Sequence, residues 1–452
     1  MQQAAWRADG RWARLARAVL SLLVLLMILP EGLDYARLAA PTVTTSSLDG
    51  SGSPLGHLLW LLVLGSSTAL VLWRAGLAQR VLANLNLWFV GLLLLAALSL
   101  GWSIDPALTT RRLVRVLTLV LCLFAFVCTG WHERRLQSVL RPLLTSFLLA
   151  SLAFGVGWPE YAIHRELSAE LVGAWRGLTS HKNALGGLAA TSCLLWCHAG
   201  VTGEAPRLRS WVGFGIGFLC LLLSRSTTSL LATLFTCGLL VAFLPQMGAK
   251  RSRLRWVTRP ALVLTLLLGL GSVSSMPGLS LFSAPVALLA GKDGSLTGRT
   301  AIWELVRDHI ARRPLFGSGY GAYWEPNRGI GTESAVFVKR LEGFYPGSSH
   351  NGYLEVTNDL GVCGLLLLSG YLVSYVREAV RCSTREWTQG LLCLALWLQQ
   401  ALTNFSESHW LNVTSVDFVF LSVATFTLAR QRVQREFLAL HGPVPVVAQW
   451  NP

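Results

Sequence analysis

Charged side chains are scarce in this sequence. Only 13% of its 452 residues are Asp, Glu, Lys or Arg, whereas 53% are hydrophobic and 18 are tryptophans. A soluble domain of this size needs a more polar surface, so the composition excludes an ordinary soluble fold. The chain is predicted to be a polytopic membrane protein.

Cysteine is absent from the longest hydrophilic segment, at about 277–350, although the chain has nine cysteines elsewhere. This distribution does not favour a disulfide framework. The sequence also lacks an HExxH motif and a Cys/His quartet, so neither a catalytic nor a structural zinc site is indicated. We therefore expect no metal and no cofactor.

Apolar runs of about 17 to 25 residues are long enough to cross a bilayer as helices. About twelve such spans are predicted, at 16–31, 55–74, 81–101, 112–129, 142–158, 183–199, 210–224, 227–247, 260–276, 353–376, 388–405 and 412–429. The expected fold is therefore all-α.

The spans divide the chain into three parts. Residues 1–276 hold the first nine predicted helices, 277–350 form a large loop, and 351–452 hold the last three helices and a tail. Inside the loop, "TGRTAIWELVRDHIARRPLFGSGYG" predicts a short helix, because apolar residues recur at helical spacing from Ile302 to Ile310 before Pro314 ends the pattern.

Basic residues outnumber acidic ones and give a net charge of +15. A nucleic-acid partner is not the best explanation, because most of the 38 lysines and arginines alternate with the predicted spans, as the positive-inside rule describes. This topology places both termini in the cytoplasm and the 277–350 loop outside. The N-terminus also resembles a signal peptide, but no convincing cleavage site follows Leu29, so an uncleaved first helix is expected.

The stretch "SSHNGYLEVTNDLG" at 348–361 carries polar groups into a predicted span. Ser348 or Ser349 is expected to cap the helix, which places His350 near the outer membrane surface. Glu355 and Asp359 then project with their polar neighbours toward the bundle or a watery cavity, because such groups are costly in hydrocarbon. The alternative is an interfacial histidine followed by solvated acids.

Several arginines lie on the outer side, against the topological bias, and so need another explanation. They are Arg176 before the sixth predicted span, Arg225 in a tight turn, Arg299 at the start of the loop helix and Arg340 before His350. Guanidinium groups at one membrane face can hold a phosphate through forked hydrogen bonds. The alternative for each is snorkelling at the interface or a local ion pair.

A histidine beside arginines suggests a reaction type. The imidazole can take a proton from an attacking hydroxyl while the arginines stabilise a departing phosphate, and no metal is needed. This chemistry fits glycosyl transfer from a diphosphate-linked lipid.

Four motifs carry a family resemblance: "LSLGWSIDP", "RGLTSHKNALGG", the loop-helix segment quoted above and "HNGYLEVTNDLG". With these motifs the chain resembles the O-antigen ligase and polysaccharide polymerase family of the bacterial inner membrane. The resemblance implies a GT-C-like membrane fold and an active site that faces the periplasm.

The resemblance also implies roles for individual residues. His350, which ten intervening residues separate from Gly361, matches the histidine regarded as catalytic in the family. Arg299 and Arg176 match by context the arginines that hold the diphosphate of an undecaprenyl-linked donor. Arg225 departs from the family spacing, because the leucine that follows it comes one place later, and Arg340 matches by region only. Glu355, Asp359 and Glu407 are alternative supports for the histidine.

Two activities occur in this family. Polymerases extend a lipid-linked repeat unit, and ligases transfer a finished polysaccharide to lipid A-core; "WSIDP" and "SHKN" favour a polymerase of the succinoglycan type. The expected partners are the lipid-linked donor, a glycan or lipid A-core acceptor, the bilayer and other assembly proteins. A flippase for the same anionic lipid is the rival class, and a structural partner in an assembly complex is a third.

Overall fold

The computed structural model describes residues 10–30, 33–35, 54–129, 135–165, 171–247, 299–324, 346–412 and 415–441. Within these ranges the chain is helical and contains no extended strand, apart from one isolated antiparallel bridge between Ile163 and Trp175. The predicted all-α class is confirmed for this part of the chain.

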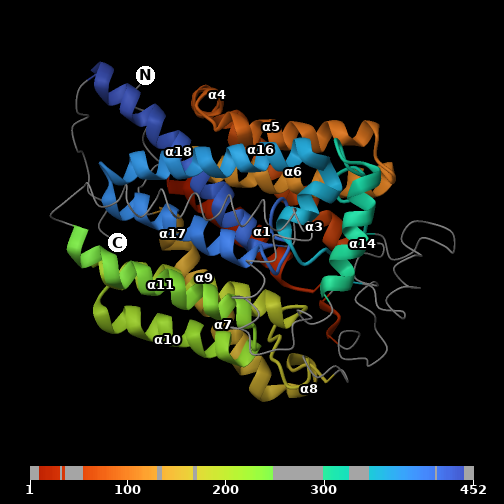
Figure 1. The fold of residues 1–452 in the computed structure, drawn as a ribbon. Coiled ribbons are helices and arrows are strands. Elements are labelled where there is room, and N and C mark those ends of the chain that lie inside the picture. Colours follow the sequence, from red (N-terminus) through yellow and green to blue (C-terminus); the bar gives the residue numbers. More distant parts are fainter. Residues whose placement is uncertain are drawn as a thin grey trace.

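The long helices lie side by side, and α14 stands across one end of the bundle (Figure 1). The first half contains α1 (Gly10–Ile28), α3 (Pro54–Trp73), α4 (Ala75–Ala83), α5 (Leu87–Leu98), the 3-10 turn η4 (Ser99–Gly101), α6 (Pro106–Cys128), α7 (Arg135–Gly157) and α8 (Pro159–Ala162). The second half contains α9 (Lys182–Thr202), α10 (Arg207–Ser224), α11 (Thr227–Met247), α14 (Arg299–Arg312), α16 (Gly352–Ser383), α17 (Trp387–Thr403) and α18 (Val416–His441).

Five of the described helices are long and apolar enough to cross a membrane, namely α3, α9, α10, α16 and residues 137–157 of α7. With the bent pair of α4 and α5 there are up to six. Each predicted span overlaps helical residues except 260–276, which lies outside the described residues, as do 277–298 and 325–345 of the predicted loop. The protein is therefore an all-α membrane protein, and the total of about twelve spans stays a prediction.

The predicted span 81–101 is wrong as a single straight helix. The chain turns by 101° between α4 and the α5–η4 segment. Asn86 causes the new start, because its side-chain oxygen accepts hydrogen bonds from the backbone amides of Trp88 (3.1 Å) and Phe89 (3.4 Å) and so caps α5. The apolar run was readable from the sequence, but the asparagine cap inside it was not recognised.

The loop helix at 299–312 is confirmed as α14, and it contacts α16. Ile302, Leu305 and Val306 form a small apolar cluster with residues of α16 and of the turn after α14. The predicted helical stripe is thus the face that docks α14 on the bundle. This packing fixes Arg299, the first residue of α14, at the end of the bundle.

Helix α16 is broken at Gly361, whose φ of +66° and ψ of −166° lie outside the helical region. The break frees two backbone amides, and the segment after α14 pairs with both. Val362 N donates to Pro314 O (2.8 Å) and Cys363 N to Leu315 O (3.2 Å). A broken helix inside a membrane protein is tolerated where neighbouring backbone satisfies its freed groups.

The carbonyl groups before the break are paired by the same segment. Ser318 N donates to Asn358 O (3.0 Å), and Gly319 N donates to Asp359 O (2.9 Å). The Asp359 carboxylate accepts a further bond from Gly321 N (2.7 Å). The polar residues that enter the predicted span therefore hold the glycine-rich turn. The backbone amides of this turn donate their hydrogen bonds to α16.

We predict that Gly361→Ala destabilises the protein by more than about 2 kcal/mol, because a left-handed φ strains an L-residue. The added Cβ would also overlap the backbone of Leu315. Thermal unfolding of the detergent-solubilised protein measures the effect. Gly65→Ala in α3 is the matched control, because a Cβ there meets nothing within 4 Å, and equal midpoints for the two variants would contradict the account.

Candidate active site

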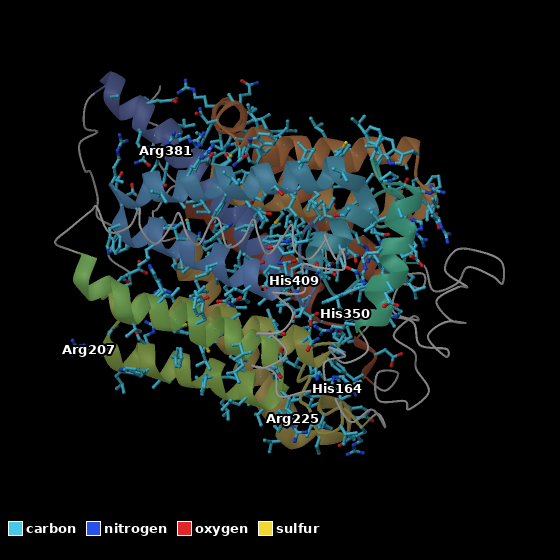
Figure 2. All side chains as sticks on the ribbon, in the orientation of Figure 1. His164, Arg207, Arg225, His350, Arg381 and His409 are labelled. Atoms are coloured by element: carbon cyan, nitrogen blue, oxygen red, sulfur yellow. The ribbon has the colours of Figure 1, made fainter. Side chains whose placement is uncertain are left out.

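His350 lies at the end of the bundle where α14 and α8 are found, as do His164 and Arg225, whereas Arg207 and Arg381 lie at the opposite end (Figure 2). The separation agrees with the predicted topology, in which the second pair is cytoplasmic. The candidate site is therefore described around His350.

His350 immediately precedes the capping residue of α16 and has a left-handed backbone with φ +47°. Asn351, not Ser348 or Ser349, caps the helix: its side-chain oxygen accepts hydrogen bonds from Tyr353 N (3.0 Å) and Leu354 N (3.1 Å). The predicted cap is wrong because the serine side chains are used elsewhere. Asparagine tolerates the cap conformation at least as well as serine does.

The segment that carries His350 is bound to the turn between α17 and α18. Ser408 Oγ accepts a hydrogen bond from Asn351 N (3.1 Å) and lies 3.2 Å from Ser349 Oγ. Gly352 N donates to Asn404 O (2.8 Å). These bonds bring Glu407 of that turn next to the imidazole.

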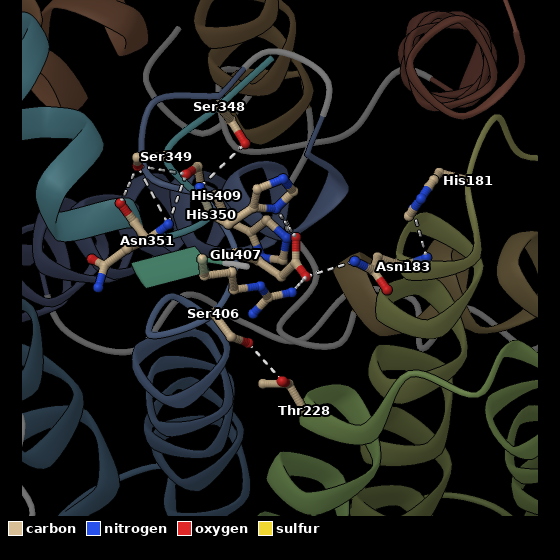
Figure 3. Close-up of polar contacts among 12 residues, drawn as sticks. His181, Asn183, Thr228, Ser348, Ser349, His350, Asn351, Ser406, Glu407 and His409 are labelled. Carbon is tan, nitrogen blue, oxygen red and sulfur yellow. Dashed lines mark hydrogen bonds and ion pairs between the residues drawn. The ribbon is translucent and has the colours of Figure 1, made fainter. Parts of the chain in front are cut away.

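Glu407 joins three segments through its two carboxylate oxygens (Figure 3). Oε1 accepts from Asn183 Nδ2 at 2.7 Å, and the Arg299 Nη2 lies 3.3 Å from the same oxygen. Oε2 lies 3.6 Å from His350 Nδ1, an ion-pair distance slightly longer than a hydrogen bond. The structure thus brings together His350, Arg299 and Glu407, which the sequence analysis named separately.

The Glu407 carboxyl is strongly acidic. Burial alone would raise its pKa, but His350, Arg299 and His409 outweigh that effect and lower the pKa to about 2. Glu407 therefore carries a negative charge at any working pH. A permanent anion at this position favours a ring in which the His350 Nδ1 faces it as a donor.

The other two candidate acids have different partners. Glu355 Oε2 accepts from Ser349 N at 2.7 Å and so holds the residue beside His350. Asp359 holds the glycine-rich turn, as described above. Asn351, Asn358 and Asp359 are buried, so the predicted orientation toward the bundle is confirmed.

Arg176 and Arg225 both hold the segment before α9. Arg176 is 2% exposed, and its Nε donates to Tyr161 O at 2.8 Å. Arg225 has a left-handed φ of +51°, is exposed, and donates from Nη1 to Val172 O at 2.9 Å. Arg340 lies outside the described residues.

The sequence analysis missed a second carboxylate–histidine pair. His409 Nδ1 lies 2.8 Å from Asp417 Oδ2, and Thr191 donates to Asp417 Oδ1 at 3.1 Å. Burial opposes the charged form of His409, but Asp417 and Glu407 raise its pKa overall. The sequence signal for this pair lies in "ESHWLNVTSVD", where a second acid, Asp417, follows His409. Of the residues in this segment, the sequence analysis named only Glu407.

His181 and His164 were also missed, although "SHKN" was among the quoted motifs. Their rings lie 5.2 Å apart in an edge-to-face arrangement. His164 Nε2 accepts from Lys182 N at 3.1 Å and His181 Nδ1 from Asn183 N at 3.3 Å. Both rings therefore cap the backbone at the start of α9, the helix that supplies Asn183 to Glu407.

In the described part of the chain, no group of three or more His, Cys, Asp and Glu side chains is arranged to hold a metal ion. The groups around Glu407 are imidazole, guanidinium and amide. This set can bind an anion and move a proton.

Comparisons with known proteins agree with this chemistry. A family model described as O-antigen ligase matches residues 212–369, which include Arg299, His350 and the broken half of α16. The exopolysaccharide production protein ExoQ of Rhizobium meliloti (strain 1021) is 28% identical over 317 residues, which are 66% of this chain and 66% of ExoQ. The matched chain thus spans slightly less than two thirds of that relative. Together with the motifs, these matches support membership of the O-antigen ligase and polysaccharide polymerase family.

Proposed function

We propose that this protein is a metal-independent glycosyltransferase that faces the periplasm. It transfers a glycan from an undecaprenyl-diphosphate carrier to an acceptor hydroxyl and so polymerises exopolysaccharide or O-antigen repeat units. The observation that carries the proposal is the shared contact of His350 and Arg299 with Glu407. A proton acceptor and a cation are thereby held at one place.

His350 is the proposed base. With Nδ1 facing Glu407, the neutral ring carries its proton on Nδ1 and leaves Nε2 as the acceptor, as in other carboxylate–histidine pairs. The His350 Nδ1 is buried while the side chain keeps 24% exposure, so the accessible part of the ring lies on its other atoms. Nε2 is thus the ring nitrogen proposed to meet a substrate.

In the proposed reaction, the sugar leaves the lipid diphosphate and joins the acceptor. The acceptor hydroxyl oxygen forms a bond to the anomeric carbon of the donor sugar, and its proton passes to His350 Nε2. The bond between that carbon and the phosphate oxygen breaks, and its electron pair leaves with the lipid diphosphate. His350 then returns the proton to solvent.

Arg299 is the principal candidate for stabilising the departing diphosphate. One of its terminal nitrogens is near Glu407 while the side chain remains 20% exposed, and a guanidinium has five N–H donors. Arg176 and Arg225 are proposed as weaker phosphate ligands, because the contacts described for them are to backbone carbonyls. Arg340 is proposed on sequence position only.

The cellular setting is part of the proposal. Arg207 and Arg381 at the end of the bundle away from His350 support a cytoplasmic assignment for that end, with both termini there, in a bacterial inner membrane (Figure 2). The similarity to ExoQ, an exopolysaccharide production protein, supports a role in exopolysaccharide synthesis. The O-antigen ligase description of the family model supports ligation to lipid A-core as the second candidate.

A product assay separates the two activities. Purified protein is incubated with a lipid-linked repeat unit, with and without lipid A-core. We predict a ladder of lengthened lipid-linked glycans in the absence of core. Product formed only when core is present, as a single transfer, would instead assign the ligase activity.

We predict that His350→Ala lowers the rate of glycan lengthening by about 10²- to 10⁴-fold, the usual contribution of a general base. Lipid-linked units still reach the outer leaflet, because transport does not use the base. His57→Ala, a substitution at an exposed position of α3, is the control and leaves the rate unchanged. Polymer synthesis at the normal rate in the His350 variant would favour the flippase.

We predict that Glu407→Gln lowers kcat more than it raises KM, because the carboxylate acts on substrate through His350. Since the pKa of Glu407 is about 2, titration of this group does not change the rate of the unsubstituted enzyme above about pH 4. Glu304→Gln, on the exposed face of α14, is the control, and an unchanged kcat in the Glu407 variant would contradict the assignment.

A further inference from the structure

His181 is held in a defined orientation at the start of α9. Its Nδ1 accepts a hydrogen bond from Asn183 N at 3.3 Å, so the ring acts as the cap of this helix. The hydroxyl of Thr179 donates to His181 O at 2.9 Å and fixes the backbone of the same residue. The position of the second ring nitrogen follows from these two bonds.

The cap decides the tautomer of the ring. A nitrogen that accepts from a backbone amide carries no proton, so the proton of the neutral ring lies on Nε2. The neutral form is the stable one: burial first, and then His164, His350 and Lys182, lower the pKa of His181 to about 3. His181 is therefore a fixed N–H donor at neutral pH and is unsuited to act as a base.

Among the residues that the structure describes, the His181 Nε2–H group makes no hydrogen bond. Its nitrogen is not among the fully buried polar atoms that lack a partner. The ring is partly enclosed and keeps some accessible surface. A ligand can therefore reach the Nε2–H group.

The ring belongs to the same site as His350. Asn183, two residues after His181, donates to Glu407 Oε1, and Glu407 and His350 both act electrostatically on His181. Figure 3 shows His181 and Asn183 together at the start of α9, with the Asn183 side chain reaching Glu407. His164, His350 and Lys182 disfavour a proton on His181 and only Glu407 favours one, so the surroundings suit an anionic oxygen.

We propose that His181 Nε2–H donates a hydrogen bond to a phosphate oxygen of the donor's diphosphate. This inference rests on the proposed function, and it assigns a binding residue to that function outside the set of arginines. His181 supplies a directed donor without adding a further positive charge, while Arg299 supplies the charge.

Two substitutions separate the donor from the cap. His181→Asn places an amide oxygen near the position of Nδ1, so it keeps the cap and removes the distant donor. His181→Gln places an amide nitrogen near the position of Nε2, so it keeps the donor and weakens the cap. Both variants are made in the full chain and purified in the same detergent.

The test measures binding of farnesyl diphosphate, a short polyprenyl diphosphate, by calorimetry, together with the Tm. We expect His181→Asn to bind at least about tenfold more weakly than the unsubstituted chain, as for a lost hydrogen bond to a charged group, with a nearly unchanged Tm. We expect His181→Gln to bind within about threefold of the unsubstituted chain, although its Tm is lower.

Equal affinity of His181→Asn and the unsubstituted chain would overturn the assignment, as would equal losses in both variants. A change confined to the KM for the acceptor would overturn it as well, because the ring would then contact the acceptor. Failure of the proposed function is distinguishable, since it shows as an absence of glycan lengthening by the unsubstituted chain.

Discussion

The described site depends on one carboxylate. Glu407 lies in the turn between α17 and α18, yet its oxygens contact side chains from the start of α9, the start of α14 and the residue before the cap of α16. Its negative charge attracts the Arg299 guanidinium and helps to raise the pKa of His409, while Asn183 donates a hydrogen bond to the carboxylate.

The break in helix α16 supports this arrangement. At Gly361 the backbone of α16 leaves the helical path, and the segment that follows α14 satisfies the freed amides and carbonyls. The same contacts hold α14, and therefore Arg299, against the helix that begins beside His350. Asp359, a polar residue inside an apolar span, thus has a structural role. The chemical role is proposed for His350, at the outer end of the same span.

Much of the helical architecture could be predicted from the sequence, because apolar runs and the stripe of α14 are local patterns. The bend before α5 could not, since it depends on whether Asn86 uses its side chain as a cap. The choice among Glu355, Asp359 and Glu407 was equally inaccessible: Glu407 is far from His350 in sequence, and only tertiary packing brings the two together. His181 and His409 carry no distinctive sequence pattern, because one ring acts as a helix cap and the other pairs with Asp417 only in the folded turn.

The central claim is that Glu407 acts through His350, and a double-mutant cycle on the lengthening rate tests it most directly. The cycle compares the unsubstituted chain, each single variant (His350→Ala and Glu407→Gln) and the double variant. The account predicts that the double variant is no slower than His350→Ala alone, because the carboxylate has no base left to orient. A double variant slowed by the product of the two single effects would contradict it.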